Sequence, residues 1–181
     1  MVKKINACVF ISGNGSNLKS IIKNSRGYNF PIKVKLVITN NMNAYGIKYA
    51  NKYDIPYKFY NSCNQNYFER NCLRELKKRK IKFLCLAGFM KILSNKFIKH
   101  FKYKIINIHP SLLPKFKGLN THKRVLRSKE KFTGCSVHYI NAKLDSGSII
   151  LQKKILIKKN ETESSLKKRV LKIEHKIYPQ A

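Results

Sequence analysis

The chain has 181 residues, and 43% of them are hydrophobic, which is enough to bury a substantial core and excludes a wholly disordered polycation. Lysine and arginine total 39 against 8 aspartates and glutamates, so the formal net charge is +31. No apolar run approaches the roughly 18 residues of a membrane span, and the apolar stretch near the N-terminus is too short for a signal-peptide core. We therefore expect a cytoplasmic protein without a membrane segment.

Predicted strands and helices alternate along the chain. Short apolar runs indicate buried strands, and apolar residues at helical spacing indicate amphipathic helices. The predicted strands occupy residues 5–11, 32–39, 57–60, 83–87, 104–108, 134–140 and 148–157. The predicted helices begin after residue 17, occupy 44–52, 67–79, 94–100 and 121–128, and begin again near Thr162, with Ser94 as a cap. This alternation predicts an α/β fold with a mainly parallel central sheet, helices on both faces and a single domain over residues 1–181.

The five cysteines are far apart and include no Cys-x-x-Cys pair, so we expect reduced thiols rather than a zinc knuckle or a redox dithiol. The five histidines show no ligand-type spacing either, and no metal site is expected.

The positive charge allows two interpretations. A basic surface suits a nucleic-acid partner, because neutralising phosphates releases counterions. However, the basic residues are spread along the whole chain, and Lys, Asn, Ile, Tyr and Phe, which have A/T-rich codons, dominate the sequence. No zinc-finger, RNP-type or basic-zipper pattern is present. We favour compositional drift over a specific nucleic-acid site, and expect weak nonspecific binding at low salt in either case.

A glycine-rich loop follows the first predicted strand. Gly13 and Gly15 allow the backbone to turn sharply and to approach a ligand closely. The next helix directs its free N–H groups and its positive dipole end at the same point. The spacing matches neither a dinucleotide fingerprint nor a P-loop. The loop alone is consistent with a phosphate site and with a plain turn.

Two polar residues end the strand predicted at 104–108. Alternation along a strand places Asn107 and His109 on the same side, outside the carboxyl ends of the strands where open α/β sheets bind ligands. Asn is a neutral donor that suits an oxyanion, and His suits proton transfer near neutral pH. Asp145 lies in a Leu-Asp-Ser-Gly turn, which by itself is an ordinary turn signal. A carboxylate near His109 would favour the imidazolium ion and position a water.

Five segments, taken together, resemble the phosphoribosylglycinamide formyltransferase family, folate-dependent enzymes of purine biosynthesis. The segments span essentially the whole chain: Ile11-Ser-Gly-Asn-Gly-Ser-Asn17, Leu86-Ala-Gly-Phe-Met-Lys-Ile-Leu93, Asn107-Ile-His-Pro-Ser-Leu-Leu-Pro114, Gly134-Cys-Ser-Val-His138 and Leu144-Asp-Ser-Gly147. The His-Pro-Ser-Leu-Leu-Pro segment is shared with the wider folate formyltransferase superfamily. The Ser-Gly-Asn-Gly-Ser-Asn loop narrows the resemblance to the enzymes that act on glycinamide ribonucleotide.

The resemblance implies a Rossmann-like formyltransferase fold. It also implies transfer of a formyl group from 10-formyltetrahydrofolate to the amine of 5'-phosphoribosylglycinamide, by direct attack through a tetrahedral intermediate. The implied catalytic residues are Asn107, His109 and Asp145. The implied ribonucleotide contacts are Gly15, Ser16 and Asn17, at the phosphate, together with Glu174. The implied folate contacts are Gln65, Met90, Lys91, Ile92, Leu93 and Asn107.

The sequence departs from the family in three places. Gln65 aligns with a folate-contacting arginine, Lys91 stands where arginine is common, and the chain stops at Ala181, where relatives usually continue. A lysine replaces the bidentate fork of an arginine with a point charge.

Three alternatives remain. A methionyl-tRNA formyltransferase would suit the charge, but that family carries a further nucleic-acid-binding domain for which 181 residues leave no room. A formyltetrahydrofolate hydrolase would carry an N-terminal regulatory domain, whereas the fold here is expected to begin at Ile5. A basic binding protein with a decayed active site conflicts with the intact Asn107, His109 and Asp145. We expect small-molecule substrates, no specific nucleic acid, no membrane, and a monomer or homodimer.

Overall fold

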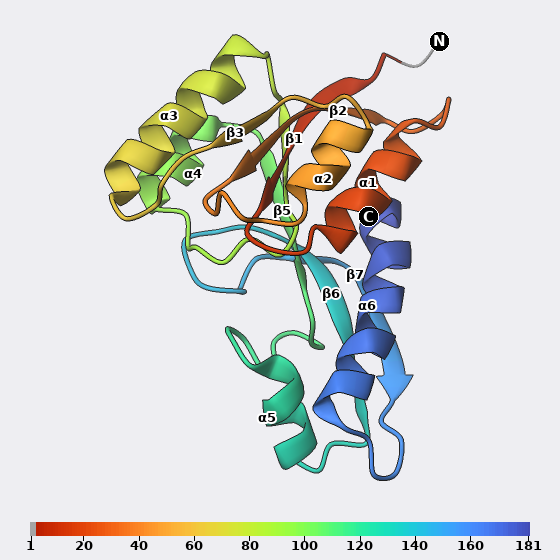
Figure 1. The fold of residues 1–181 in the computed structure, drawn as a ribbon. Helices are drawn as coiled ribbons and strands as arrows, with labels where there is room; N and C mark the ends of the chain where they lie inside the picture. The colour runs from red at the N-terminus through yellow and green to blue at the C-terminus, as the bar shows by residue number, and fades with distance from the viewer. Residues whose placement is uncertain (1–2) are drawn as a thin grey trace. The chain divides into compact units, whose positions relative to one another are not determined.

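Two compact units make up the chain, one ending at Ile106 and the other running from Asn107 to Ala181. A computed structural model describes residues 3–181 (Figure 1). The single domain expected over residues 1–181 stays a prediction. No helix in the described part of the chain is both long enough and apolar enough to cross a membrane.

The first unit contains a parallel sheet built around β1 (Ile5–Ile11). Strand β1 pairs in parallel with β2 (Ile32–Thr39) on one side and with β4 (Phe83–Leu86) on the other, and β2 pairs in parallel with β3 (Tyr57–Phe59). Every residue from Ala7 to Ile11 is fully buried, which explains the continuous apolar run in the sequence. Strand β5 (Lys104–His109) carries the chain into the second unit.

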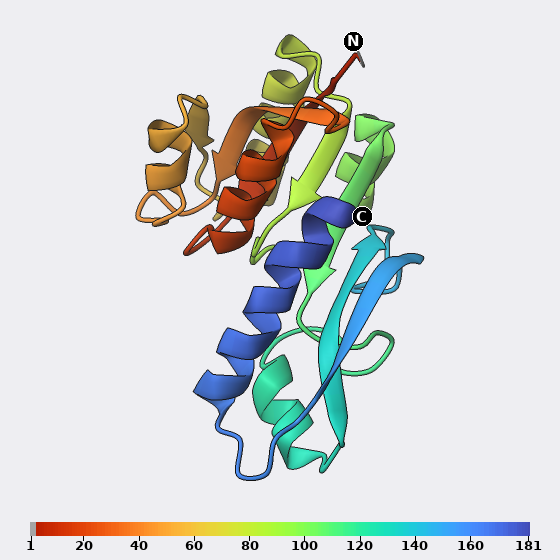
Figure 2. The same cartoon turned by 90° about the vertical axis from the view of Figure 1, so that its right-hand side faces the viewer.

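Helices cover both faces of the sheet in the first unit. Helix α1 (Ser16–Ser25) lies on one face, whereas α3 (Gln65–Lys78) and α4 (Asn95–Phe101) lie on the other (Figures 1 and 2). The short α2 (Ile47–Lys52) connects β2 to β3. Leu18, Ile21 and Ile22 form the buried stripe of α1, as their helical spacing predicts.

The second unit is built from an antiparallel strand pair and two helices. Strand β6 (Phe132–Tyr139) pairs with β7 (Ile149–Leu156), and α5 (Thr121–Arg127) and α6 (Glu163–Gln180) complete the unit. Leu166, Val170 and Ile177 of α6 are buried, as expected from their spacing. The predicted α/β class with mainly parallel pairing is therefore confirmed, and the antiparallel pair is its exception.

Two helix starts differ from the predicted ones. Helix α2 begins at Ile47 rather than at residue 44, because Ala44 closes a turn in which its amide donates to the carbonyl of Asn41. Helix α3 begins at Gln65 rather than at residue 67, because the side chain of Asn64 accepts a hydrogen bond from the Tyr67 amide and caps the helix. Ser94 caps α4 as predicted, and Thr162, near the predicted start of the last helix, caps α6.

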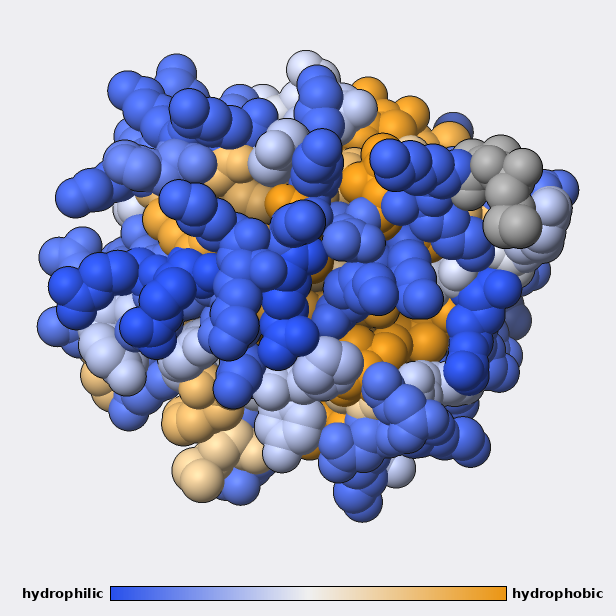
Figure 3. Space-filling model, turned by 90° about the horizontal axis from the view of Figure 1, so that it is seen from above, coloured by the Kyte–Doolittle hydropathy of each residue, from blue (hydrophilic) through white to orange (hydrophobic). Residues whose placement is uncertain are grey.

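The surface is strongly cationic because many acidic residues face inward. Glu69, Glu75, Asp145 and Glu174 are buried, which is half of the 8 acidic residues, so few carboxylates remain to offset 39 basic side chains. Hydrophilic side chains cover most of the face seen in Figure 3, and apolar side chains form smaller patches there. All five cysteines are free thiols, as predicted, and only Cys63 is exposed.

Candidate functional site

The second unit brings the half-buried Asn107 and the buried His109 and Asp145 into one cluster. Asn107 and His109 lie two residues apart at the carboxyl end of β5, and Asp145 lies in the turn between β6 and β7. The turn approaches β6 closely, since a Cβ atom at Gly147 would lie 1.7 Å from the carbonyl oxygen of Tyr139. Only glycine permits this approach, and it brings the Asp145 carboxylate to the end of β6.

His109 lies between two hydrogen-bond acceptors. Its Nδ1 is 3.3 Å from Oδ2 of Asp145, and its Nε2 is 2.9 Å from the carbonyl oxygen of Phe116. The same Asp145 oxygen accepts a hydrogen bond of 2.8 Å from the amide of Gly118. Both ring nitrogens of His109 therefore face acceptor oxygens, and the ring lies within ion-pair distance of a buried carboxylate.

A second histidine, His138 on β6, completes the cluster. Burial lowers the pKa of His138, although Asp145 Oδ1, 3.6 Å from Nε2, acts in the opposite direction. Its Nδ1 lies 2.9 Å from the carbonyl oxygen of Tyr139, so the neutral ring donates from Nδ1 and keeps a lone pair on Nε2. That lone pair faces Nδ2 of Asn107 at 3.3 Å. His138 thus accepts one amide proton of Asn107 and fixes the orientation of that side-chain amide.

The glycine-rich loop lies in the first unit, where it leads from β1 into α1. Gly15 adopts φ +67° as the N-cap of α1, and a Cβ atom there would lie 2.4 Å from the Cα of Gly46. Glycine is therefore required at position 15 by both conformation and contact. The cap makes no side-chain hydrogen bond, and the first turn of α1, which includes Ser16 and Asn17, contains no acidic residue. This helix end has the features of an anion site.

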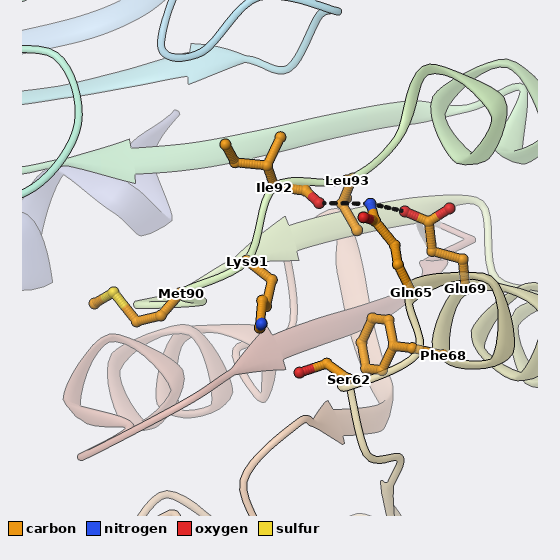
Figure 4. A pocket seen from close by; sticks show the side chains of 8 residues that line it. All are labelled: Ser62, Gln65, Phe68, Glu69, Met90, Lys91, Ile92 and Leu93. Atoms are coloured by element: carbon orange, nitrogen blue, oxygen red, sulfur yellow. Dashed lines mark hydrogen bonds between the residues drawn. The ribbon is translucent and has the colours of Figure 1, made fainter.

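The first unit also contains a cavity of about 280 Å³, shown in Figure 4. All five predicted folate-contacting residues of this unit line it. The lining residues are Ser62, Gln65, Phe68, Glu69, Met90, Lys91, Ile92 and Leu93. Phe68 provides an aromatic wall and stacks on Phe89, with 5.8 Å between ring centroids. Met90 and Ile92 are each 65% exposed, so large apolar side chains are available to a ligand.

A buried carboxylate holds the two sides of this cavity together. Glu69 of α3 accepts hydrogen bonds from the amide of Ser94, at 2.7 Å, and from its hydroxyl. Gln65 donates from Nε2 to Glu69 Oε1 at 3.0 Å and to the Ile92 carbonyl at 3.1 Å (Figure 4). These contacts fix the segment carrying Ile92 against helix α3.

Glu174, the remaining predicted ribonucleotide contact, is buried in α6 at 6% exposure. Burial and, less strongly, the Glu174 carboxylate raise the pKa of the Cys135 thiol to about 12. In the described residues no group of three or more His, Cys, Asp or Glu side chains has the arrangement of a metal site.

The sequence analysis assigned no role to several residues of these sites. His138 falls two positions after Ser136 on a buried strand, but alternation alone does not single out its ring. Ser62 and Phe68 also line the cavity without having been predicted. Glu69 lies one helical turn after Gln65, so its place on the same face of the helix was available from the spacing.

Comparisons with known proteins agree on the family. The formyl transferase family matches residues 5–181. The chain is 40% identical to the human trifunctional purine biosynthetic protein adenosine-3 over 99% of this chain but only 18% of that protein. It is 38% identical to the phosphoribosylglycinamide formyltransferase of Haemophilus influenzae, over 98% of this chain and 84% of that protein.

A solved structure extends the agreement to the fold. The phosphoribosylglycinamide formyltransferase from Anaplasma phagocytophilum is 38% identical, with a TM-score of 0.92, and the match covers 98% of this chain and 85% of that one. This likeness confirms the expected formyltransferase fold. The chain therefore belongs to the formyl transferase family and, within it, to the phosphoribosylglycinamide formyltransferases.

Proposed function

We propose that this chain transfers a formyl group from 10-formyltetrahydrofolate to the amine of 5'-phosphoribosylglycinamide, in purine biosynthesis. The observation that carries the proposal is the buried cluster in which His109 faces Asp145 while His138 orients Asn107. It combines an imidazole, a neutral amide donor and a carboxylate, groups that can stabilise an oxyanion and move a proton in an acyl transfer.

In this mechanism the neutral amine of the ribonucleotide attacks the formyl carbon, and the carbonyl electrons move to oxygen. The free amide proton of Asn107 and the charge of His109 stabilise that oxyanion. Collapse of the tetrahedral intermediate breaks the bond between the formyl carbon and N10 of the folate. One proton moves from the attacking amine to N10, through water held by Asp145, and leaves tetrahydrofolate and the formylated ribonucleotide.

His109 has to exchange one contact during this reaction. Its Nε2 faces the Phe116 carbonyl at 2.9 Å, so direct donation to the substrate oxygen requires that carbonyl to move aside. Hydrogen bonds of catalytic groups commonly tighten only when substrate is bound.

The two sites of the first unit supply the remaining contacts in the proposal. Gly15, Ser16 and Asn17 bind the ribonucleotide phosphate at the end of α1, which is supported by its uncapped, acid-free first turn. Gln65 and residues 90–93 bind the folate, which is supported by their shared cavity and its aromatic wall. Glu174 contacts the ribonucleotide. The five free thiols favour a cytoplasmic location for the protein. We propose that it acts as a monomer or a homodimer.

A steady-state assay tests the function. Purified protein with 10-formyltetrahydrofolate and glycinamide ribonucleotide is expected to release tetrahydrofolate and formylated ribonucleotide in equal amounts. Two parallel reactions, one with initiator methionyl-tRNA as acceptor and one without acceptor, are expected to release none. Release of tetrahydrofolate without an acceptor would instead indicate a hydrolase.

A further inference from the structure

One hydroxyl group joins the glycine-rich loop to the cavity in the first unit. The Ser12 hydroxyl accepts a hydrogen bond of 2.8 Å from the amide of Met90 and donates one of 2.7 Å to Oδ1 of Asn40. Ser12 directly precedes Gly13 in the loop, and Met90 lines the cavity. A single side chain thus contacts both segments.

The backbone of Ser12 is held by residues close in sequence to these two partners. Its amide donates to the carbonyl of Gly88 at 3.2 Å, and its carbonyl accepts from Nδ2 of Asn41 at 3.0 Å. Ser12 therefore cannot move without changing contacts on the segment that leads to Met90. A shift of the loop at Gly13 is transmitted to one wall of the cavity.

A second connection runs through Asn40 to another residue that lines the cavity. Its Nδ2 donates to the hydroxyl of Ser62 at 3.2 Å, and Ser62 lines the cavity. The donors and acceptors form one consistent chain. The backbone amide of Met90 donates to the Ser12 hydroxyl, which donates to the side-chain oxygen of Asn40, and the side-chain amide of Asn40 donates to the Ser62 hydroxyl. Chains of this kind strengthen cooperatively.

From this network we infer that Ser12 is a positioning residue that couples the binding of the two substrates. This inference rests on the proposed function, in which the loop binds the ribonucleotide phosphate and the cavity binds the folate. Whichever substrate binds first stabilises the shared hydrogen bonds further. The second substrate then meets a wall that opens less often, so it binds more tightly. The effect is reciprocal, because each ligand changes the affinity for the other by the same factor.

Calorimetry measures this factor directly. The Kd of glycinamide ribonucleotide is determined alone and with a saturating, formyl-free tetrahydrofolate analogue, in the wild type, Ser12→Ala and Ser25→Ala. Ser25→Ala is the matched control, because its buried hydroxyl donates to the Ile22 carbonyl in the same unit, at the far end of α1. We expect the analogue to tighten ribonucleotide binding by about fivefold, the low end of typical couplings, in the wild type and the control. In Ser12→Ala the ratio is expected to fall to about one.

The ratio separates coupling from a merely structural role. If Ser12 only supported the fold, Ser12→Ala would weaken both substrates and leave the ratio unchanged, which would overturn the inference. A ratio of one in an active wild-type enzyme would also overturn it while leaving the proposed function intact. Failure of both ligands to bind the wild type would instead overturn the proposed function, and the coupling with it.

A measurement on the unmodified protein avoids dependence on a variant that fails to fold. Ribonucleotide alone is expected to slow hydrogen exchange of the Met90 amide, since that amide donates to Ser12. The amide of Ile98 in α4, which donates to the Ser94 carbonyl, serves as an internal reference and is expected not to change. Unchanged exchange at Met90 with bound ribonucleotide would contradict the inference.

Discussion

His109 and Asp145 form a buried pair of titratable side chains with almost no access to water. Nδ1 of the histidine lies 3.3 Å from Oδ2 of the aspartate, and the two side chains are 6% and 7% exposed. Removing one partner of a buried pair leaves the other without compensation. The two residues are therefore expected to act as one unit in stability and in catalysis.

Asp145→Asn retains the shape of the side chain but removes its negative charge from beside His109. We expect kcat to fall by about 10²–10⁴, the usual range for a general acid–base group. Binding of glycinamide ribonucleotide is expected to persist, because its phosphate is assigned to the loop at Gly15. Stopped-flow turnover and calorimetric binding check the two expectations. Near-normal turnover would show that Asp145 has only a structural role in its turn.

The double variant tests whether the pair acts together. Groups that work as a unit show strongly non-additive effects, so His109→Asn combined with Asp145→Asn is expected to cost little more than the worse single change. If the loss of kcat in the double variant equals the product of the two single losses, the two residues act independently.

The sequence predicted the parts of the site that follow local periodicity. Alternation along a strand was enough to place Asn107 and His109 on one side of β5, and helical spacing located the buried stripe of α1. It did not predict the role of His138 or Ser12. Their hydrogen bonds join residues 31 and 78 positions apart, and nothing in a local pattern encodes such a contact. The roles taken from the family resemblance remain predictions.

His138 is expected to act through Asn107 rather than on the substrate. In His138→Leu the amide of Asn107 loses its acceptor and can rotate away from the oxyanion. Removing an oxyanion donor costs about 10²–10³ in kcat, and a misoriented donor is expected to cost about 10- to 100-fold. The KM of glycinamide ribonucleotide should stay close to that of the wild type, because its proposed contacts are Gly15, Ser16, Asn17 and Glu174. His138→Gln, which can present an oxygen acceptor, is expected to recover part of kcat; no recovery would contradict the orienting role.

Two histidines with lowered pKa values predict a loss of stability in mild acid. Burial lowers the pKa of His122 and of His138 below the ordinary value of 6.5. The unfolded chain therefore binds more protons than the folded one once the pH falls below about 6.5, and the free energy of unfolding falls with it, by at most about 1.4 kcal/mol per pH unit for each histidine. Urea titrations between pH 5 and 8 (roughly the range in which histidine titrates) measure this slope. His122→Asn removes one proton site and is expected to flatten it; an unchanged slope would show that His122 does not contribute.

The cationic surface predicts nonspecific binding to polyanions. The basic residues are spread over the chain, and half of the carboxylates are buried. We therefore expect lysines to contact the phosphates of a nucleic acid without sequence-specific contacts to its bases. Filter binding at 50 mM salt is expected to retain oligonucleotides of any sequence equally. At 200 mM salt the affinity should fall by about 10³ or more where six or more phosphates are contacted. A sequence preference that persists at the higher salt would point to a dedicated nucleic-acid site.

Gln65 is expected to limit the affinity for folate. Its Nε2 already donates to Glu69 Oε1 and to the Ile92 carbonyl, so little donor capacity remains for a ligand in the cavity. An arginine has five N–H donors and can keep both contacts while offering a charged donor to the folate. A charged hydrogen bond contributes roughly 1.5–3 kcal/mol against about 1 for a neutral one, so Gln65→Arg should lower the folate KM by about fivefold. Turnover should change less, since Gln65 belongs to the cavity and not to the cluster around His109.

Gln65→Leu, which loses both hydrogen bonds, provides the opposite comparison and should raise the folate KM. If Gln65→Arg folds normally and its folate KM is unchanged or higher, position 65 does not face the folate, and the assignment of this cavity to the cosubstrate is wrong at that residue.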